Sequence, residues 1–214
     1  GTSLSSIQNK LSTSNEQHVT AFIPTISRRQ EAQTIMDDQL MPKQQYSERI
    51  GWGRDAQGLT DDAAPPTALN PNDPRLSKTY AEFPLTSFDE LLDLGLQYLP
   101  PRKNLNDPLS LVDIGSGCGR LVFYSAMTRG SSSSTPAGWN VQGIEISNLL
   151  HQRAIEYVHQ GVNTGVFSTK ACTSVDNTMS LYFGPAEDYT TLLRNADIVF
   201  AYSTAFSARA FSPE

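Results

Sequence analysis

A glycine-rich segment near the middle of the chain has the residue types and spacing needed to hold a small ligand. It reads Asp113-Ile114-Gly115-Ser116-Gly117-Cys118-Gly119 and directly follows an apolar run that is typical of a buried strand. Glycines have no Cβ, so the backbone of a strand-to-helix turn can approach a ligand closely. The free amides of the helix that follows can bind an anionic group. Asp113 would add a negative charge beside the same ligand.

The spacing of these glycines bears on which ligand they would hold. Dinucleotide-binding loops follow G-x-G-x-x-G, and Arg120 stands at the third glycine position here. The pattern present is instead [DE]-x-G-x-G-x-G. A second acid, Glu145, ends the next apolar run, and a carboxylate there could accept hydrogen bonds from both hydroxyls of a ribose. A nicotinamide dinucleotide, the cofactor of a dehydrogenase, therefore fits this loop less well than another nucleoside-containing ligand does.

The segment resembles motif I of the class I S-adenosylmethionine-dependent methyltransferases, and the resemblance covers residues 105–214. It implies a transferase with S-adenosylmethionine as cofactor and a sheet ordered 3-2-1-4-5-7-6. It places Asp113 near the ammonium and sulfonium of the cofactor and Glu145 at its ribose. The further cofactor contacts that it implies are Gly115, Ser116, Gly117, Gly119, Ile146 and, after the third strand where this family binds adenine, Glu187 or Asp188.

A narrower resemblance extends upstream of this core. Thr79-Tyr80-Ala81-Glu82 and Thr86-Ser87-Phe88-Asp89 are similar to a segment of the non-SET histone lysine methyltransferases that folds over the methionine end of the cofactor. This chain differs by Ala81 in place of glycine and by the inserted Phe83-Pro84-Leu85. The resemblance implies cofactor contacts at Tyr80, Glu82 and Thr86. For the acceptor side we expect Tyr80 and Glu82 on this overlying segment, and Tyr202 and Ser203, as catalytic residues, at the carboxyl end of the fourth strand. It implies as acceptor a protein, lysine included, or a small-molecule nucleophile.

The elements that must position these residues alternate between strands and helices. Upstream, S-x-x-E/Q capping patterns predict a short helix between Ser27 and Pro42 and an amphipathic helix from Ser87 to Leu99. Further helices are expected at residues 121–127 and from a Ser147 cap to Gly161. Strands are expected at residues 109–114, 139–146, 179–183 and 196–202. This order predicts an α/β fold with a Rossmann-like parallel sheet and a helical and irregular N-terminal extension.

Three sections follow from this pattern. Residues 1–78 hold a polar tail up to residue 24, the short helix and a Pro-rich linker; residues 79–104 hold the cofactor-covering segment and its helix. Residues 105–214 are the N-terminal half of an S-adenosylmethionine-binding domain. Ser212-Pro213-Glu214 is typical of a helix start, so we expect a fragment of a longer methyltransferase, truncated after the fourth strand. The apolar edge at residues 198–201 would then favour self-association.

Composition narrows the class of protein. The net charge of −6 gives no strong signal for nucleic-acid binding, and no apolar run is long enough to span a membrane. Two cysteines and no recognisable signal peptide favour an intracellular protein, cytoplasmic or nuclear. The three histidines are scattered and no metal site is expected; His151 and His159 are expected on a helix surface. The leading hypothesis is thus a methyltransferase, and the alternative is a non-catalytic cofactor- or partner-binding fragment of one.

Overall fold

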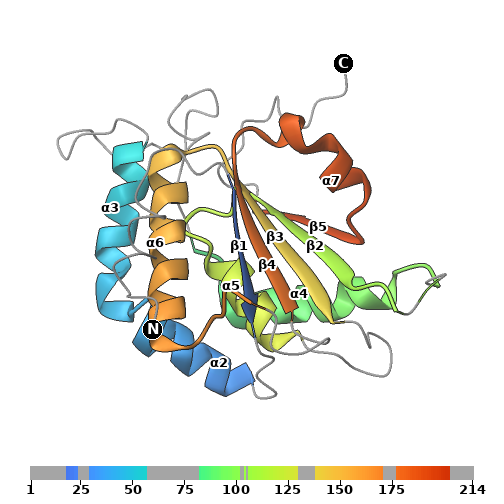
Figure 1. Ribbon diagram of the computed structural model, residues 1–214, viewed down its shortest axis with the longest axis horizontal. Coiled ribbons are helices and arrows are strands. Elements are labelled where there is room, and N and C mark those ends of the chain that lie inside the picture. The colour runs from blue at the N-terminus through green and yellow to red at the C-terminus, as the bar shows by residue number, and fades with distance from the viewer. Residues whose placement is uncertain are drawn as a thin grey trace, which may run out of the picture.

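The computed structural model describes residues 18–23, 29–56, 82–101, 104, 106–129, 138–170 and 177–202. Within these ranges the chain forms one five-stranded sheet in the order β1-β4-β3-β2-β5 (Figure 1). Three of the four pairings are parallel, and β1 runs antiparallel to β4. The expected α/β fold is confirmed, and the sheet is mostly parallel, which is compatible with a Rossmann-like fold. The strands are β1 (His18–Ile23), β2 (Leu109–Ile114), β3 (Trp139–Glu145), β4 (Asn177–Phe183) and β5 (Ile198–Ala201).

The parallel strands follow the order expected from the sequence. Along the chain they are β2, β3, β4 and β5, and in space β2 lies between β3 and β5 while β4 lies beyond β3. Helix α5 (Arg120–Thr128) links β2 to β3, and α6 (Asn148–Thr164) links β3 to β4. Both crossovers step in the same direction, so right-handed connections place both helices on the same face of the sheet.

Strand β1 corrects one expectation. Residues 18–23 were expected in a polar tail, but they pair with β4 from Asn177 to Tyr182. Ala21 and Ile23 are buried on the core side, whereas His18 and Thr20 are exposed on the other side, which is the alternation of a half-buried strand. The tail prediction is therefore wrong for this segment, and residues 1–17 lie outside the described part of the chain.

The N-terminal helices form an outer layer. Helix α2 (Arg29–Ile35) runs directly into a π-helical turn, η1 (Met36–Leu40), which confirms the short helix expected before Pro42. A 3₁₀ turn, η2 (Lys43–Gln45), leads into α3 (Tyr46–Ala56), which was not expected. Helices α2 and α3 lie against α5 and α6 respectively (Figure 1). The described residues before position 57 thus belong to the same core as the sheet.

Helix α4 (Leu85–Gln97) confirms the amphipathic helix but not its capping box. The residue that precedes the helix is Pro84, and no side chain caps the helix start, so Ser87 lies inside the first turn. Pro84 sets an extended backbone (φ −61°, ψ 130°) immediately before the helix. Helix α4 packs against α5.

Helix α6 begins as expected and ends later. The Ser147 hydroxyl accepts a hydrogen bond from the Leu150 amide, which confirms the cap. The helix passes through Gly161, where the Phe167 ring fills the space of a side chain, and ends at Gly165 in the left-handed region (φ 77°). His151 is 1 % exposed and contacts the Phe183 ring, so the surface placement expected for it is wrong.

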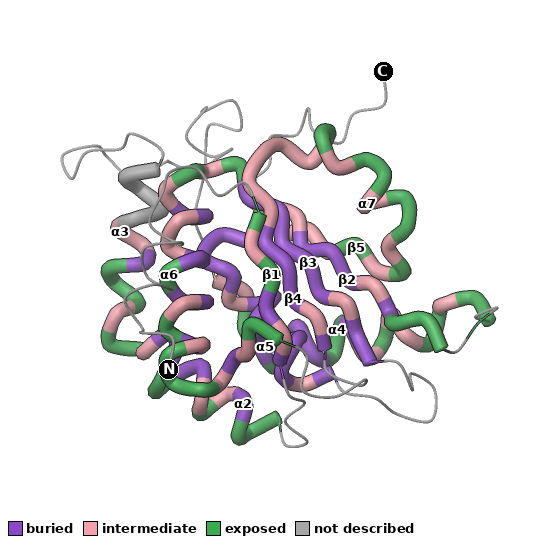
Figure 2. The backbone as a smooth tube through the Cα atoms, in the orientation of Figure 1, coloured by how far each residue is buried: buried purple, intermediate pink, exposed green. Residues whose placement is uncertain are grey.

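The core lies between the sheet and the helices. Leu111, Val141 and Met179 stand side by side on β2, β3 and β4, and each is at most 1 % exposed. Figure 2 shows the same burial along the three central strands. Strand β5 pairs with β2 alone in this sheet, and Val199 on it is 47 % exposed. Within the described ranges, none of the helices is both long and apolar enough to cross a bilayer.

Candidate cofactor-binding site

The glycine loop joins the carboxyl end of β2 to the start of α5. Gly115, Gly117 and Gly119 have φ values of +76°, +57° and +84°, in the left-handed region that other residues rarely adopt. A Cβ at position 119 would also lie 2.7 Å from the Phe123 ring. The loop therefore depends on glycine at these positions, and it turns the chain sharply from the sheet into the helix.

Hydrogen bonds attach the loop to the neighbouring strand β3. The amides of Gly115 and Ser116 both donate to the Ile144 carbonyl, at 2.8 and 3.1 Å. Gly143, one position earlier on β3, has no side chain between the strand and the loop. A Cβ there would lie 2.8 Å from Ser116 Oγ and 2.9 Å from Val122 Cγ2. Sequence reasoning missed Gly143, although a glycine inside a strand signals close approach of another segment.

Glu145 ends β3 and faces the loop. Its carboxylate is buried and accepts hydrogen bonds from the amides of Gly117 and Ser147, each at 2.7 Å. Burial raises the pKa of Glu145, and the backbone amides that donate to it oppose this shift. The side chain is thus held in place at the junction of the glycine loop and the first turn of α6. Each carboxylate oxygen has a second acceptor position, which leaves capacity for the hydroxyls of a ligand.

Asp113 lies beside Glu145 at the end of β2 and is 4 % exposed. Its strand neighbours, Gly143 on β3 and Phe200 on β5, carry no ionisable group. Among the residues that the structure describes, none donates a hydrogen bond to this carboxylate or forms an ion pair with it. Burial raises the pKa of Asp113 to about 8, and the negative charge of Glu145 contributes to the increase. A buried acid without a partner is costly, and such groups gather where ligands bind.

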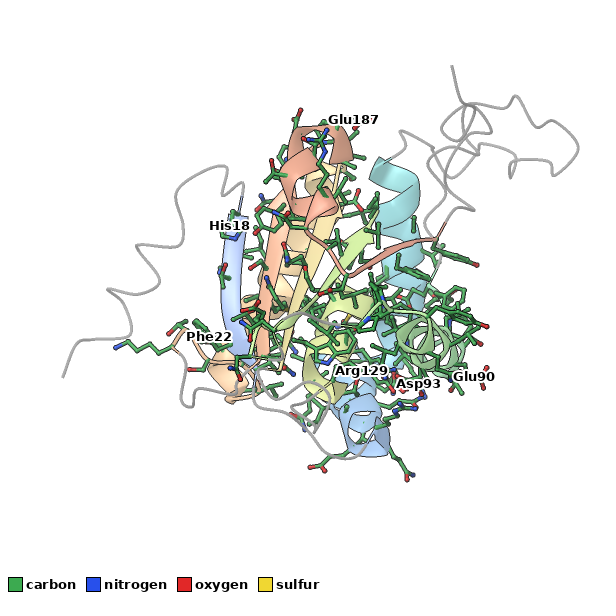
Figure 3. The ribbon with its side chains drawn as sticks, turned by 90° about the vertical axis from the view of Figure 1, so that its right-hand side faces the viewer. His18, Phe22, Glu90, Asp93, Arg129 and Glu187 are labelled. Carbon is green, nitrogen blue, oxygen red and sulfur yellow. The ribbon has the colours of Figure 1, made fainter. Side chains whose placement is uncertain are left out.

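The carboxyl end of β4 adjoins the same place. The Gly184 amide donates to the Glu145 carbonyl at 3.0 Å, which joins the segment after β4 to the end of β3. Glu187 and Asp188 follow in the 3₁₀ helix η4 (Ala186–Tyr189), before α7 (Thr190–Arg194), and both are exposed. Figure 3 places Glu187 at one end of the sheet, away from Asp93 and Arg129. Nothing in these contacts distinguishes the two acids as ligands of adenine.

Ile146 is unusual for its exposure. It follows Glu145 directly, and it is 68 % exposed although it is a large apolar residue. An apolar side chain beside a buried carboxylate, at the end of a parallel strand, can cover one face of a planar ring. The cofactor contact that the resemblance implies for Ile146 stays a prediction.

The upstream residues have different surroundings. Both Glu82 carboxylate oxygens face guanidinium groups: Arg49 Nε lies 2.5 Å from Oε1, and Arg120 Nε lies 3.4 Å from Oε2. Thr86 is exposed in the first turn of α4. The Tyr202 ring, at the end of β5, meets the Phe83 ring edge-on with centroids 4.9 Å apart. Tyr80 and Ser203 lie outside the described residues.

The structure therefore brings together one set of expected residues, namely Asp113, Gly115, Ser116, Gly117, Gly119, Glu145 and Ile146. Glu82 is linked to this set through Arg120, the residue that follows the loop. No protein-family model matches the chain, and comparison with curated proteins gave no significant match. A function for this site has to come from the chemistry of its residues.

Proposed function

We propose that this site binds S-adenosylmethionine and that the chain is an S-adenosylmethionine-dependent methyltransferase of the class I type. The observation that carries the proposal is the pair of buried acids, Asp113 and Glu145, at the ends of adjacent strands around the glycine loop. Asp113 has no partner among the described residues, and a ligand with a positive charge would supply one. Two backbone amides hold the Glu145 carboxylate in place. A side chain that positions a ligand needs to be fixed in this way.

The chemical groups of this ligand match the site one by one. Its ammonium and sulfonium are cations, which suit the Asp113 carboxylate. Its carboxylate suits the amides at the start of α5. The ribose diol suits Glu145, and the adenine ring suits the exposed side chain of Ile146. A dinucleotide would instead bring a pyrophosphate, whose negative charge the two acids would repel.

When bound, the cofactor supplies an electrophilic methyl group that passes in line to a nucleophile. The task of the protein is then to align the acceptor with that methyl group and to exclude water. A general base is needed only where the acceptor arrives protonated. Tyr202, which follows β5, and Ser203, the next residue in the sequence, are our candidates for the acceptor side. A protein side chain, lysine included, or a small-molecule nucleophile is the acceptor class that we propose.

Glu145→Ala tests the proposal. The variant removes the acceptor for the ribose hydroxyls, so the Kd for S-adenosylhomocysteine should rise by about 10- to 100-fold, the scale of charge-assisted hydrogen bonds. Glu156→Ala is the matched control, because Glu156 lies exposed on α6 and pairs with Arg153 on the same helix. Circular dichroism would show that both variants fold.

An unchanged Kd in a folded Glu145→Ala variant would contradict the assigned role of this acid. Transfer of a tritiated methyl group to a mixture of proteins separates an enzyme from a binding module. Transfer by the wild-type chain supports the enzyme. Tight binding with no transfer to any acceptor favours the non-catalytic alternative.

A further inference from the structure

A cluster of five charged side chains joins the N-terminal helices to the start of α5. We refer to Asp37, Lys43, Arg49, Glu82 and Arg120 as the ion-pair cluster. Arg49 is 2 % exposed, and the side chains of Asp37 and Glu82 are both 9 % exposed. Lys43 alone is largely exposed, at 71 %. Charges this deeply buried are rare in a core and require partners.

Arg120 is the centre of the cluster. Its Nε lies 3.4 Å from Glu82 Oε2, its Nη2 lies 3.8 Å from Asp37 Oδ1, and its Nη1 donates to the Phe83 carbonyl at 3.1 Å. It thus touches both η1 and the segment that leads into α4. Arg120 is also the first residue of α5 and directly follows Gly119, so a guanidinium held on three sides fixes the point at which the glycine loop ends.

Arg49 holds Glu82 in place. The guanidinium contacts both carboxylate oxygens, Nε–Oε1 at 2.5 Å and Nη2–Oε2 at 3.3 Å. Its third nitrogen, Nη1, donates to the Pro42 carbonyl at 2.9 Å. A two-point pairing of this kind sets the orientation of the carboxylate as well as its position.

The π-helical turn presents the remaining acid. Asp37 lies in η1, where it is 7 % exposed and also pairs with Lys43 at 2.8 Å. π-Helical turns are rare and are frequently found at functional sites. Buried ion pairs contribute little net stability compared with apolar side chains of the same volume. Stability alone therefore does not account for a buried cluster to which η1, η2, α3, α5 and the segment before α4 all contribute.

We propose that the ion-pair cluster positions the glycine loop, and that Glu82 acts on ligand binding through Arg120 and not by touching the ligand. The N-terminal helices then contribute to the site, because Asp37 on η1 pairs with Arg120 directly and Arg49 on α3 holds Glu82, which pairs with Arg120. The inference rests on the proposed function for the choice of ligand. The effect of the ion-pair cluster on the ligand-free loop does not depend on which ligand binds.

The test compares Glu82→Gln with Asp89→Asn, a matched control elsewhere in the fold. Asp89 is also a buried acid, paired with Arg129 Nη2 at 2.5 Å and with the Tyr124 hydroxyl at 2.6 Å. Arg129 also pairs with Asp93, and Figure 3 shows these two residues far from Glu187 and the site end of the sheet. Each substitution removes one buried negative charge and keeps the shape of the side chain. The readouts are amide hydrogen exchange of residues 115–122 in the empty chain and the Kd for S-adenosylhomocysteine.

We expect Glu82→Gln to speed exchange in the loop and to raise the Kd by about 5- to 20-fold, the range of coupling between packed positions. Asp89→Asn should lower the unfolding temperature and leave both readouts unchanged. Equal exchange in wild type and Glu82→Gln would overturn the proposal. If the Kd then still rises, Glu82 is a direct ligand; if it does not, the cluster is only structural.

Arg49→Lys serves where Glu82→Gln does not fold, since it keeps the charge and loses the two-point pairing. It should shift loop exchange in the same direction by a smaller factor, and no shift would count against the proposal. Should wild type not bind S-adenosylhomocysteine, the proposed function fails while the exchange comparison still decides the positioning role.

Discussion

Replacing Asp113 by asparagine should stabilise the ligand-free chain in a way that depends on pH. Asparagine has almost the shape of a protonated aspartic acid but cannot ionise. In the folded chain burial raises the pKa of Asp113 to about 8, against an ordinary value of 3.8. The folded state therefore binds this proton more tightly than the unfolded state does. Stability of wild type should fall as pH rises between these two values, because folding must either retain the proton or bury a charge.

The size of the effect follows from the two pKa values. Each pKa unit corresponds to about 1.4 kcal/mol. A solution pH of 7 lies about three units above the pKa of this carboxyl in the unfolded chain. Burying Asp113 therefore lowers the stability of the wild-type chain at pH 7 by on the order of 4 kcal/mol. The gain from Asp113→Asn should thus be small near pH 4, increase by about 1.4 kcal/mol per pH unit, and level off above pH 8. Glu145 is the described titratable group whose charge acts on Asp113, so it belongs to the same titration.

Urea denaturation of wild type and Asp113→Asn at pH 5, 6, 7 and 8 measures this slope. Glu156→Gln, an exposed acid on α6, is the control and should show no comparable trend. A difference between wild type and Asp113→Asn that does not change with pH would refute the reasoning, as would an asparagine variant that is less stable at pH 8. The same variant should lose affinity for a cationic ligand, because it removes the counter-charge.

Two further substitutions test how the sheet supports the site. Asn177→Ala should lower the unfolding free energy by about 2–4 kcal/mol in urea titrations, since it removes hydrogen bonds to Trp139 N and to the carbonyls of Ala126 and Arg129; a loss under 1 kcal/mol would contradict this. Gly143→Ala should lower the unfolding temperature and weaken ligand binding, because its Cβ would meet Ser116 Oγ at 2.8 Å. Gly95→Ala is its control: no atom lies within 4 Å of that Cβ, so the helix should gain about 0.5–1 kcal/mol.

The part of the fold that the sequence predicted is the part with local signals. Apolar runs that end in a glycine turn marked β2, and the Ser147 cap marked the start of α6. β1 was missed because it adds to the sheet edge by pairing with residues about 160 positions away. α3 was missed because its apolar residues form no clear stripe and it contains Gly51 and Gly53.

The same distinction applies to the site. Asp113, the loop glycines and Glu145 were found because each stands at the end of an apolar run, and parallel strands end at one edge of the sheet. Arg49 and Asp37 were not predicted from the sequence. Their role depends on contacts with Glu82 and Arg120, which no spacing in the sequence reveals. That these residues bind S-adenosylmethionine stays a prediction.

Calorimetric titration of the wild-type chain with S-adenosylhomocysteine and, separately, with NAD tests the central claim most directly. At pH 8 and above, Asp113 is sufficiently ionised to receive a cation. We predict a saturable heat with S-adenosylhomocysteine and none with NAD, because the acids at the ends of β2 and β3 favour the ammonium group of the former over the pyrophosphate of the latter. Saturable binding of NAD with no response to S-adenosylhomocysteine would contradict the account.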